Sequence, residues 1–121
     1  MSDPTPAAAS GAPQPLTIEE FQRVDLRAGR VVAAAPHEKA DRLLVLQVDI
    51  GEATPRQIVS GIRADWTPEA LIGRSVIVIA NLQPALLRGV ESSGMLLAVR
   101  GPEKVLLLGV DGNVLPGTRV T

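Results

Sequence analysis

Short apolar segments bounded by turn-forming residues recur along the chain. The first, residues 24–35, alternates Val24, Leu26 and Ala28 with polar or small residues, which is the period-two pattern of a half-buried strand. The further segments of strand type are residues 42–51, 56–61, 75–80, 95–99 and 104–110. Strands this short, separated by Gly, Pro, Asp and Ser, favour an all-β barrel.

Two short helical segments interrupt this pattern. In residues 16–24, Thr17 is followed three residues later by Glu20, a capping box, and Ile18 and Phe21 fall on one face. One or two helical turns are expected here, with an apolar side that docks on another surface. In residues 67–73, a threonine cap is followed by proline in the first turn and a glycine stop, which predicts a second short helix.

The position of the second helix, between the third and fourth strands, points to a five-stranded Greek-key barrel of the OB-fold type. The segment 104–110 is then an extra C-terminal strand. Its apolar residues are consecutive, so both faces of this strand should be buried against other residues. We predict a dimer interface that includes Ile18, Phe21 and Leu107, although a central strand buried within the monomer explains the same pattern equally well.

A length of 121 residues suggests one domain. Residues 1–15 hold four of the ten prolines and are rich in Ala and Ser, so we expect a disordered tail followed by a barrel domain over residues 16–121. The start of the chain lacks the basic and apolar regions of a signal peptide, and no apolar run reaches the ~20 residues that span a bilayer. A cytoplasmic location is therefore expected, with no membrane span.

The charge balance excludes a protein that coats nucleic acid indiscriminately, because the net charge is −1 and the pI is about 5.8. Three of the 13 acidic residues lie in the first 20 positions, where there is no Lys or Arg. From Phe21 onward, 12 Lys and Arg face the remaining 10 Asp and Glu. This mildly basic balance permits a local site for an anionic ligand.

Catalytic and cofactor chemistry find little support. The chain has no cysteine and one histidine, His37, which we expect to be solvated in the loop after Pro36. No nucleophile elbow surrounds Ser92 or Ser93. Metal-ligand sets, Walker motifs and dinucleotide fingerprints are also missing from the sequence, so we predict neither an enzyme nor a metal or cofactor site.

Binding of single strands by base stacking needs exposed aromatic residues, and the chain has one Phe, one Trp and no Tyr. Phe21 is expected to pack in the core or at a dimer contact, and Trp66 against the barrel end. Recognition of a folded nucleic acid through backbone and shape needs only cations and polar groups. Candidates are Lys39 and Arg42 in one loop and residues 81–95 in another.

Each candidate also has a structural interpretation. Lone arginines are common on solvated barrel faces, and this includes the cations that could extend a basic surface, namely Arg27, Arg30 and Arg63. Asn81 could cap the end of a strand, and the serine pair could satisfy local backbone donors. Met95 at a strand start is more often a core residue.

The order of motifs resembles the tRNA-binding-domain family. The matching stretches are VDLRAGRVV, HEKADRLLVLQVDIG, VSGI, ANLQP and ESSGM, and the likeness runs from about Ile18 to Val120. That family includes free-standing tRNA-binding proteins, the C-terminal domain of methionyl-tRNA synthetase and secretion-chaperone homologues. The resemblance implies an OB-fold homodimer that binds tRNA by shape, without catalysis.

The resemblance also implies a set of contact residues. Carried over by position, these are Lys39, Arg42, Asn81, Gln83, Arg88, Ser92, Ser93 and Met95. The chain departs from its relatives after the asparagine, where NLQPALL stands in place of a basic cluster such as NLKPRKL. Fewer phosphate contacts predict weak tRNA binding. The leucines at these positions favour an alternative, an export-related chaperone that binds unfolded preprotein.

Overall fold

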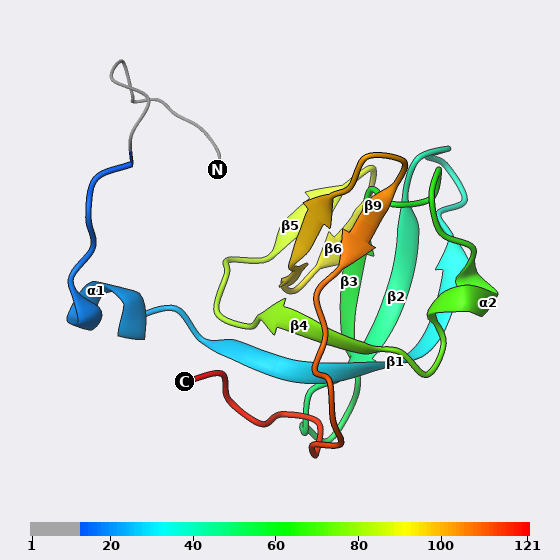
Figure 1. Ribbon diagram of the computed structural model, residues 1–121. Coiled ribbons are helices and arrows are strands. Elements are labelled where there is room, and N and C mark those ends of the chain that lie inside the picture. Colours follow the sequence, from blue (N-terminus) through cyan, green and yellow to red (C-terminus); the bar gives the residue numbers. More distant parts are fainter. Residues whose placement is uncertain (1–12) are drawn as a thin grey trace.

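The computed structural model describes residues 13–121, so most of the predicted tail lies outside the described residues. Figure 1 shows a β-barrel with two hairpins beside it and helix α1 standing apart. The elements are α1 (Ile18–Gln22), β1 (Leu26–Pro36), β2 (Leu44–Asp49), β3 (Arg56–Ser60), α2 (Pro68–Leu71), β4 (Ser75–Ile79), β5 (Ala85–Leu87), β6 (Val90–Ser92), β7 (Met95–Leu96), β8 (Ala98–Arg100) and β9 (Val105–Leu107).

Strand β1 organises the barrel because it belongs to two ladders. Its first half pairs with β4 and its second half with β2, all antiparallel, within the strand order β3-β2-β1-β4-β7. The register shifts between Val31 and Ala33, and such a bulge bends a strand. Gly29 lies where a Cβ atom would approach Val48 to 2.8 Å, so only glycine allows this close packing. The predicted five-stranded OB-type barrel, with α2 between the third and fourth strands, is confirmed.

The core follows from period-two alternation. In β2, Leu44, Leu46 and Val48 are fully buried, while Val45 and Gln47 face outward and are half-buried. Fully burying an aliphatic side chain of this size contributes about 1.5 to 3 kcal/mol, so the inward residues of β2 and β4 account for much of the stability. Helix α2 adds Leu71 to the same cluster.

Helix α1 forms as predicted but is not buried. Thr17 accepts from the Glu20 N–H at 3.1 Å, and the Glu20 carboxylate accepts from the Thr17 N–H at 2.9 Å, which completes the capping box. No residue of α1 is buried, and Ile18 and Phe21 are 63% and 40% exposed. The docking partner expected for its apolar side is not the barrel of the same chain.

The C-terminal strands differ from the prediction. Residues 95–99 split into β7 and β8, and β8 pairs with β9 in a separate two-stranded sheet. Leu107 is half-buried and packs against the core cluster. One face of β9 therefore covers the barrel through Leu107, while Leu106 points outward at 44% exposure. The place of Leu107 at a dimer interface stays a prediction.

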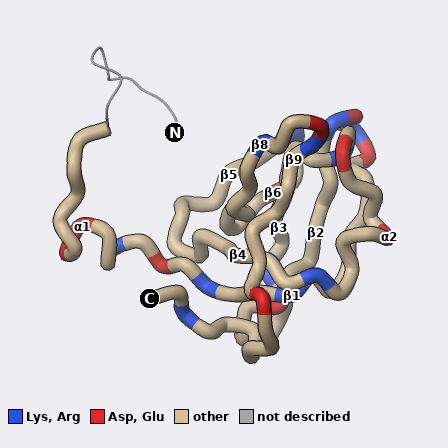
Figure 2. The backbone as a smooth tube through the Cα atoms, in the orientation of Figure 1, with Lys and Arg blue, Asp and Glu red and all other residues tan. Residues whose placement is uncertain are grey.

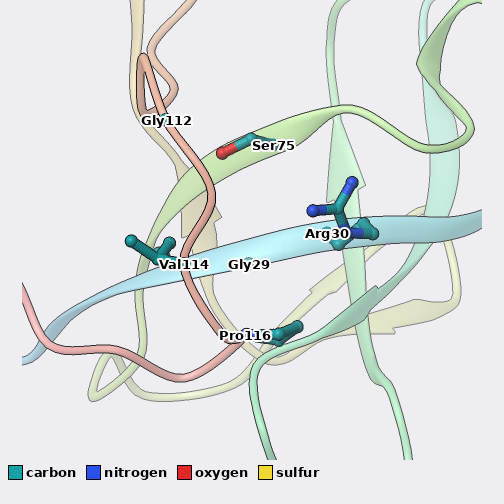
Figure 3. A pocket seen from close by; sticks show the side chains of 7 residues that line it. Gly29, Arg30, Ser75, Gly112, Val114 and Pro116 are labelled. Atoms are coloured by element: carbon teal, nitrogen blue, oxygen red, sulfur yellow. The ribbon is translucent and has the colours of Figure 1, made fainter.

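The chain end returns along β1. The Val120 N–H donates to the Leu26 carbonyl at 2.8 Å, and the Ala28 N–H donates to Thr118 at 2.8 Å. Figure 3 shows this segment crossing β1 near Gly29. The residues there line a small cavity of about 10 Å³. That volume suffices for one water molecule at most. The C-terminal segment is thus an integral cover of the barrel.

Candidate nucleic-acid interface

A cleft of about 350 Å³ lies over the outer face of β2 and β3. Residues 37–43, which we call the first lip, form one wall, and the β5–β6 hairpin, the second lip, forms the other. The lining residues are Ala35, Pro36, His37, Glu38, Lys39, Val45, Gln57, Arg88, Gly89 and Val90. In OB-folds these loops and this strand face commonly bind oligonucleotides.

The first lip carries two of the predicted cations. Lys39 and Arg42 are both exposed, and Lys39 lines the cleft. Arg63, one of the cations that could extend a basic surface, supports this lip. Its Nη1 donates to the Ala40 carbonyl at 3.3 Å and its backbone N–H donates to Arg42 at 3.4 Å.

The expectation that His37 is solvated is wrong, because its side chain is buried between the two lips. Residue His37 is 3% exposed. Its Nδ1 lies 3.0 Å from the Lys39 backbone nitrogen, and its Nε2 lies 3.0 Å from the Leu87 carbonyl oxygen. Leu87 is 50 residues away in sequence, so nothing in the local pattern around His37 signals this contact.

The second lip is a hairpin, whereas the sequence pattern predicted a loop over residues 81–95. Leu87 pairs with Val90, and the two residues between them, Arg88 and Gly89, have φ of 52° and 87°. These values match a type I′ turn, which favours Asn-Gly. Arg88 is the only non-glycine residue with positive φ among residues 13–121, at a cost of about 1 kcal/mol. The strained turn places an arginine in the cleft lining.

The floor of the cleft contains a chain of amide hydrogen bonds. Gln47 and Gln57 are opposite each other in the β2–β3 ladder, and Gln47 Nε2 donates to Gln57 Oε1 at 3.1 Å. Gln57 Nε2 then donates to the Glu91 carbonyl at 2.8 Å, which ties the second lip to the floor. Neither glutamine was predicted, although outward positions in an alternating strand would have indicated Gln47.

Ser92, which the resemblance places among the tRNA contacts, is bonded to backbone groups within the fold. It is 5% exposed, and its hydroxyl accepts from the Val59 N–H at 2.9 Å and donates to the Gly94 carbonyl at 3.1 Å. Val59 is opposite Val45 of β2, and β3 is the edge strand of its sheet, so among residues 13–121 no strand pairs with the other side of β3. The Ser92 hydroxyl fills that gap in the barrel and is not available to a ligand.

The residues that follow Ser92 also connect the end of β6 to the barrel. The Ser93 N–H donates to the Gln57 carbonyl at 2.8 Å, and its carbonyl accepts from Arg56 Nη1 at 3.3 Å. Gly94 has φ of 146° and packs closely on the end of β4, so a side chain there would be strained. Met95 is 47% exposed, so it is not the core residue that the structural interpretation suggested.

Asn81 is exposed, but both ends of its amide are engaged. Oδ1 accepts from the Asp25 N–H at 2.9 Å, and Nδ2 donates to the Arg23 carbonyl at 2.6 Å. The side chain therefore fastens the segment after α1 to the end of β4, which agrees with the capping interpretation. Gln83, two residues on, is exposed and lies outside the cleft lining.

Asp25 gathers charges at the same end of the barrel. Arg27 Nε donates to its carboxylate at 3.0 Å, and Arg119 Nε lies 3.7 Å from Oδ1. The hydrogen bond from Arg27 holds the pKa of Asp25 below its usual value, and the positive charge of Arg119 acts in the same direction against the opposing effect of burial. Arg27 is thus held in an ion pair. Arg30 likewise donates to the Gly73 carbonyl at 2.9 Å.

Trp66 packs against the barrel as expected. Its Nε1–H donates to the Val105 carbonyl at 2.8 Å, and the Asp65 carboxylate accepts from the Val105 N–H at 2.9 Å. The Lys104 ammonium lies 3.9 Å and the Arg74 guanidinium 4.7 Å from the ring centroid. These cation–π contacts occupy the ring and hold the β8–β9 hairpin on the barrel.

The structure brings together part of the predicted contact set. Lys39 and Arg88 line one cleft, while the side chains of Ser92 and Asn81 are engaged within the fold. Charges of both signs are interspersed around the hairpin tips and loops, as Figure 2 shows. Among residues 13–121 no group of three or more His, Asp or Glu could hold a metal ion. No helix in this range is long and apolar enough to cross a membrane.

These features define an OB-type barrel with a small cleft, of mixed charge, between two loops. The chain belongs to the tRNA-binding domain family, since the family described as "Putative tRNA binding domain" matches residues 26–119. The resemblance drawn from sequence motifs is therefore confirmed.

Comparisons with individual proteins agree with this family assignment. The chain is 50% identical to the methionine–tRNA ligase of Archaeoglobus fulgidus over 105 residues, which are 87% of this chain but 16% of that enzyme. Its fold is similar to that of a MetRS related protein from Pyrococcus horikoshii, with a TM-score of 0.81, 35% identity, and coverage of 89% and 99% of the two chains. It is also similar to the chaperone CsaA of Bacillus anthracis, with a TM-score of 0.78, 28% identity, and coverage of 89% and 100%.

Proposed function

We propose that this chain is a non-catalytic, shape-selective tRNA-binding protein that works as a homodimer, alone or as an auxiliary to a methionyl-tRNA synthetase. The observation that supports this most is the position of Lys39 and Arg88 on opposite lips of one cleft. Both are cations in loops of an OB-type barrel, and both can reach phosphate oxygens. The family membership supports tRNA as the nucleic acid.

The state of the polar side chains supports a binding role without catalysis. The His37 ring nitrogens are both engaged with backbone groups, so the ring has no free nitrogen for proton transfer. The Ser92 hydroxyl is engaged twice and is buried, so it is a poor nucleophile. With Ser92 and Asn81 removed from the contact set, the cations Lys39, Arg42 and Arg88 carry the binding.

Three cations per subunit imply a modest affinity. Each phosphate contact contributes about 0.7 to 0.9 to the slope of log affinity against log salt, so we expect a slope of about 3 or less per subunit. A homodimer that presents two clefts to one tRNA would raise the affinity through effective concentration.

The exposed side chains of α1 support the homodimer. Ile18, Phe21, Val24 and Val120 line a groove of about 380 Å³ together with Gln22, Arg119 and Thr121. A five-residue helix is not stable in water without tertiary packing, yet α1 buries none of its residues in its own chain. A second copy would cover this surface. Phe21→Glu should then give a monomer in sedimentation velocity, and an unchanged dimer would place the interface elsewhere.

A second candidate function is an export-related chaperone that binds unfolded polypeptide. The specific observation in its favour is the apolar character of the second lip and its approach, where Leu86 is 73% and Leu82 is 45% exposed. Exposed leucines next to a cleft can bind apolar segments of an unfolded chain. The similarity to the chaperone CsaA supports the same alternative.

Two parallel titrations separate these functions. Unfractionated tRNA is titrated at about 50 mM and about 200 mM salt, where electrostatic binding differs strongly, and a reduced, unfolded polypeptide is titrated separately. Binding of tRNA that weakens with salt supports the leading proposal. If tRNA binding is undetectable at the lower salt while the polypeptide binds, the tRNA proposal fails and the chaperone proposal replaces it.

A further inference from the structure

The one histidine of the chain connects the two lips of the cleft. We infer that His37 is a positioning residue that fixes the second lip against the first, so that Arg88 and Lys39 face the same ligand. The inference rests on the proposed tRNA-binding function, because it assigns His37 a role in that cleft. It also assigns the protonation state on which the role depends.

The hydrogen-bond partners define the form of the ring. The Lys39 backbone N–H can only donate, so Nδ1 must accept, and the Leu87 carbonyl can only accept, so Nε2 must carry the proton. The ring is therefore neutral, in the Nε2–H tautomer. At 3% exposure the ring is largely shielded from solvent, so both of its polar atoms depend on these protein partners.

The contact matters because little else holds β5. The other hydrogen bonds from the second lip to the barrel start on β6, where the Glu91 carbonyl accepts from Gln57 and the Ser92 hydroxyl accepts from Val59. Among the described residues, the bond from His37 is the only one between β5 and the barrel. A two-stranded hairpin without such an anchor is marginally stable in water.

Apolar packing does not replace the hydrogen bond. Leu86 and Leu87 are 73% and 36% exposed, so the side chains of β5 bury little surface. Arg88 follows Leu87 directly and adopts a left-handed conformation. The hairpin must also stabilise this strained conformation. Loss of the His37 bond should release the tip, and Arg88 would leave its cleft position for most of the time.

Two substitutions separate the two bonds of the ring. The side-chain oxygen of asparagine occupies about the position of Nδ1, so His37→Asn keeps the acceptor for Lys39 but does not reach Leu87. The side-chain nitrogen of glutamine occupies about the position of Nε2, so His37→Gln keeps the donor to Leu87. A side chain that only fills space at the barrel end predicts the lower melting temperature for His37→Asn, because asparagine is one methylene smaller than glutamine, and predicts that affinity falls in parallel with stability.

The positioning role predicts a difference between them. His37→Gln should bind unfractionated tRNA close to the wild-type affinity. His37→Asn should bind about five- to tenfold more weakly, as expected if the lip spends only a fifth to a tenth of its time in the binding position. The melting temperatures of the two variants should be similar, since both retain one of the two bonds.

Nitrogen-15 NMR of the single histidine gives a readout independent of RNA. The wild-type ring should show the Nε2–H tautomer, and a Nδ1–H tautomer or a rapidly exchanging solvent-exposed ring would overturn the inference. Equal tRNA affinities for wild type and His37→Asn would overturn it as well, while leaving tRNA binding itself intact. If the wild type binds no tRNA, the proposed function fails first, and the positioning role falls with it.

Discussion

The hydroxyl oxygen of Ser92 accepts a 2.9 Å hydrogen bond from the backbone N–H of Val59, 33 residues earlier in the chain. Both groups are buried. A backbone donor at the edge of a sheet is usually satisfied by a neighbouring strand, and here one side chain substitutes for the strand. The barrel is thus closed between β3 and the end of β6 by a serine whose motif alone suggests a ligand contact.

Ser92→Ala should therefore destabilise the protein. The substitution leaves the Val59 N–H buried without a partner, which costs about 1 to 3 kcal/mol. Ser93→Ala is the matched control, because Ser93 contributes its backbone N–H and carbonyl to the closure. Urea unfolding should show a loss for the first variant and little change for the second. Equal stabilities would mean that the Ser92 hydroxyl does not close the barrel.

Arg88→Asn should stabilise the fold and weaken RNA binding. Asn-Gly is the preferred pair of a type I′ turn, so the change should relieve the strain of Arg88 and raise the free energy of unfolding by about 0.5 to 1 kcal/mol. It also removes a cation from the cleft. Thermal unfolding and tRNA titration test both halves. A variant that is less stable would show that the arginine side chain has a structural role.

Asp25→Asn should lower stability in a pH-dependent way. Because Arg27 and Arg119 hold the pKa of Asp25 below its unfolded value, the carboxylate stabilises the fold above the unfolded pKa of about 4. That contribution is lost as the pH falls through the lower, folded pKa. The stability gap between wild type and variant should be constant near neutral pH and shrink in acid. Asp111→Asn, at an exposed position, serves as control, and a gap that stays constant into acid would contradict the ion pair.

Binding of tRNA should leave the fluorescence of Trp66 nearly unchanged. The indole N–H is bonded to Val105, and Lys104 and Arg74 lie over the ring, so no base can stack there without displacing them. Trp66 is the only tryptophan, which makes its emission specific. Strong quenching on titration with tRNA would instead support a base-stacking role.

Local sequence patterns were sufficient to predict the strands of the barrel. Alternation in β2, consecutive apolar residues in β4, and the threonine caps of both helices are properties of a few adjacent residues. The order of these elements was then enough to predict the OB-type barrel. The β5–β6 hairpin was missed because its turn is Arg-Gly rather than Asn-Gly, and the strain of Arg88 leaves no signal in the sequence.

Side-chain roles depended on contacts between distant residues, and prediction was weaker there. His37 and Ser92 reach backbone groups 50 and 33 residues away, so a local pattern could not distinguish a solvated side chain from a buried one. Leu107 belongs to a strand with apolar residues on both faces, and only packing shows which face meets the barrel. The exposure of Lys39 and Arg88 was easier to predict, because charged loop residues need no long-range contact to remain exposed.

The salt dependence of tRNA binding, measured for wild type, Lys39→Ala, Arg88→Ala and the control Arg100→Ala, tests whether the cleft is the RNA site. Arg100 is an exposed cation of β8 outside the cleft lining. We predict that each cleft variant weakens binding and reduces the salt slope by about one, while Arg100→Ala changes neither. Unchanged affinity and slope in both cleft variants would contradict a tRNA site between the two lips.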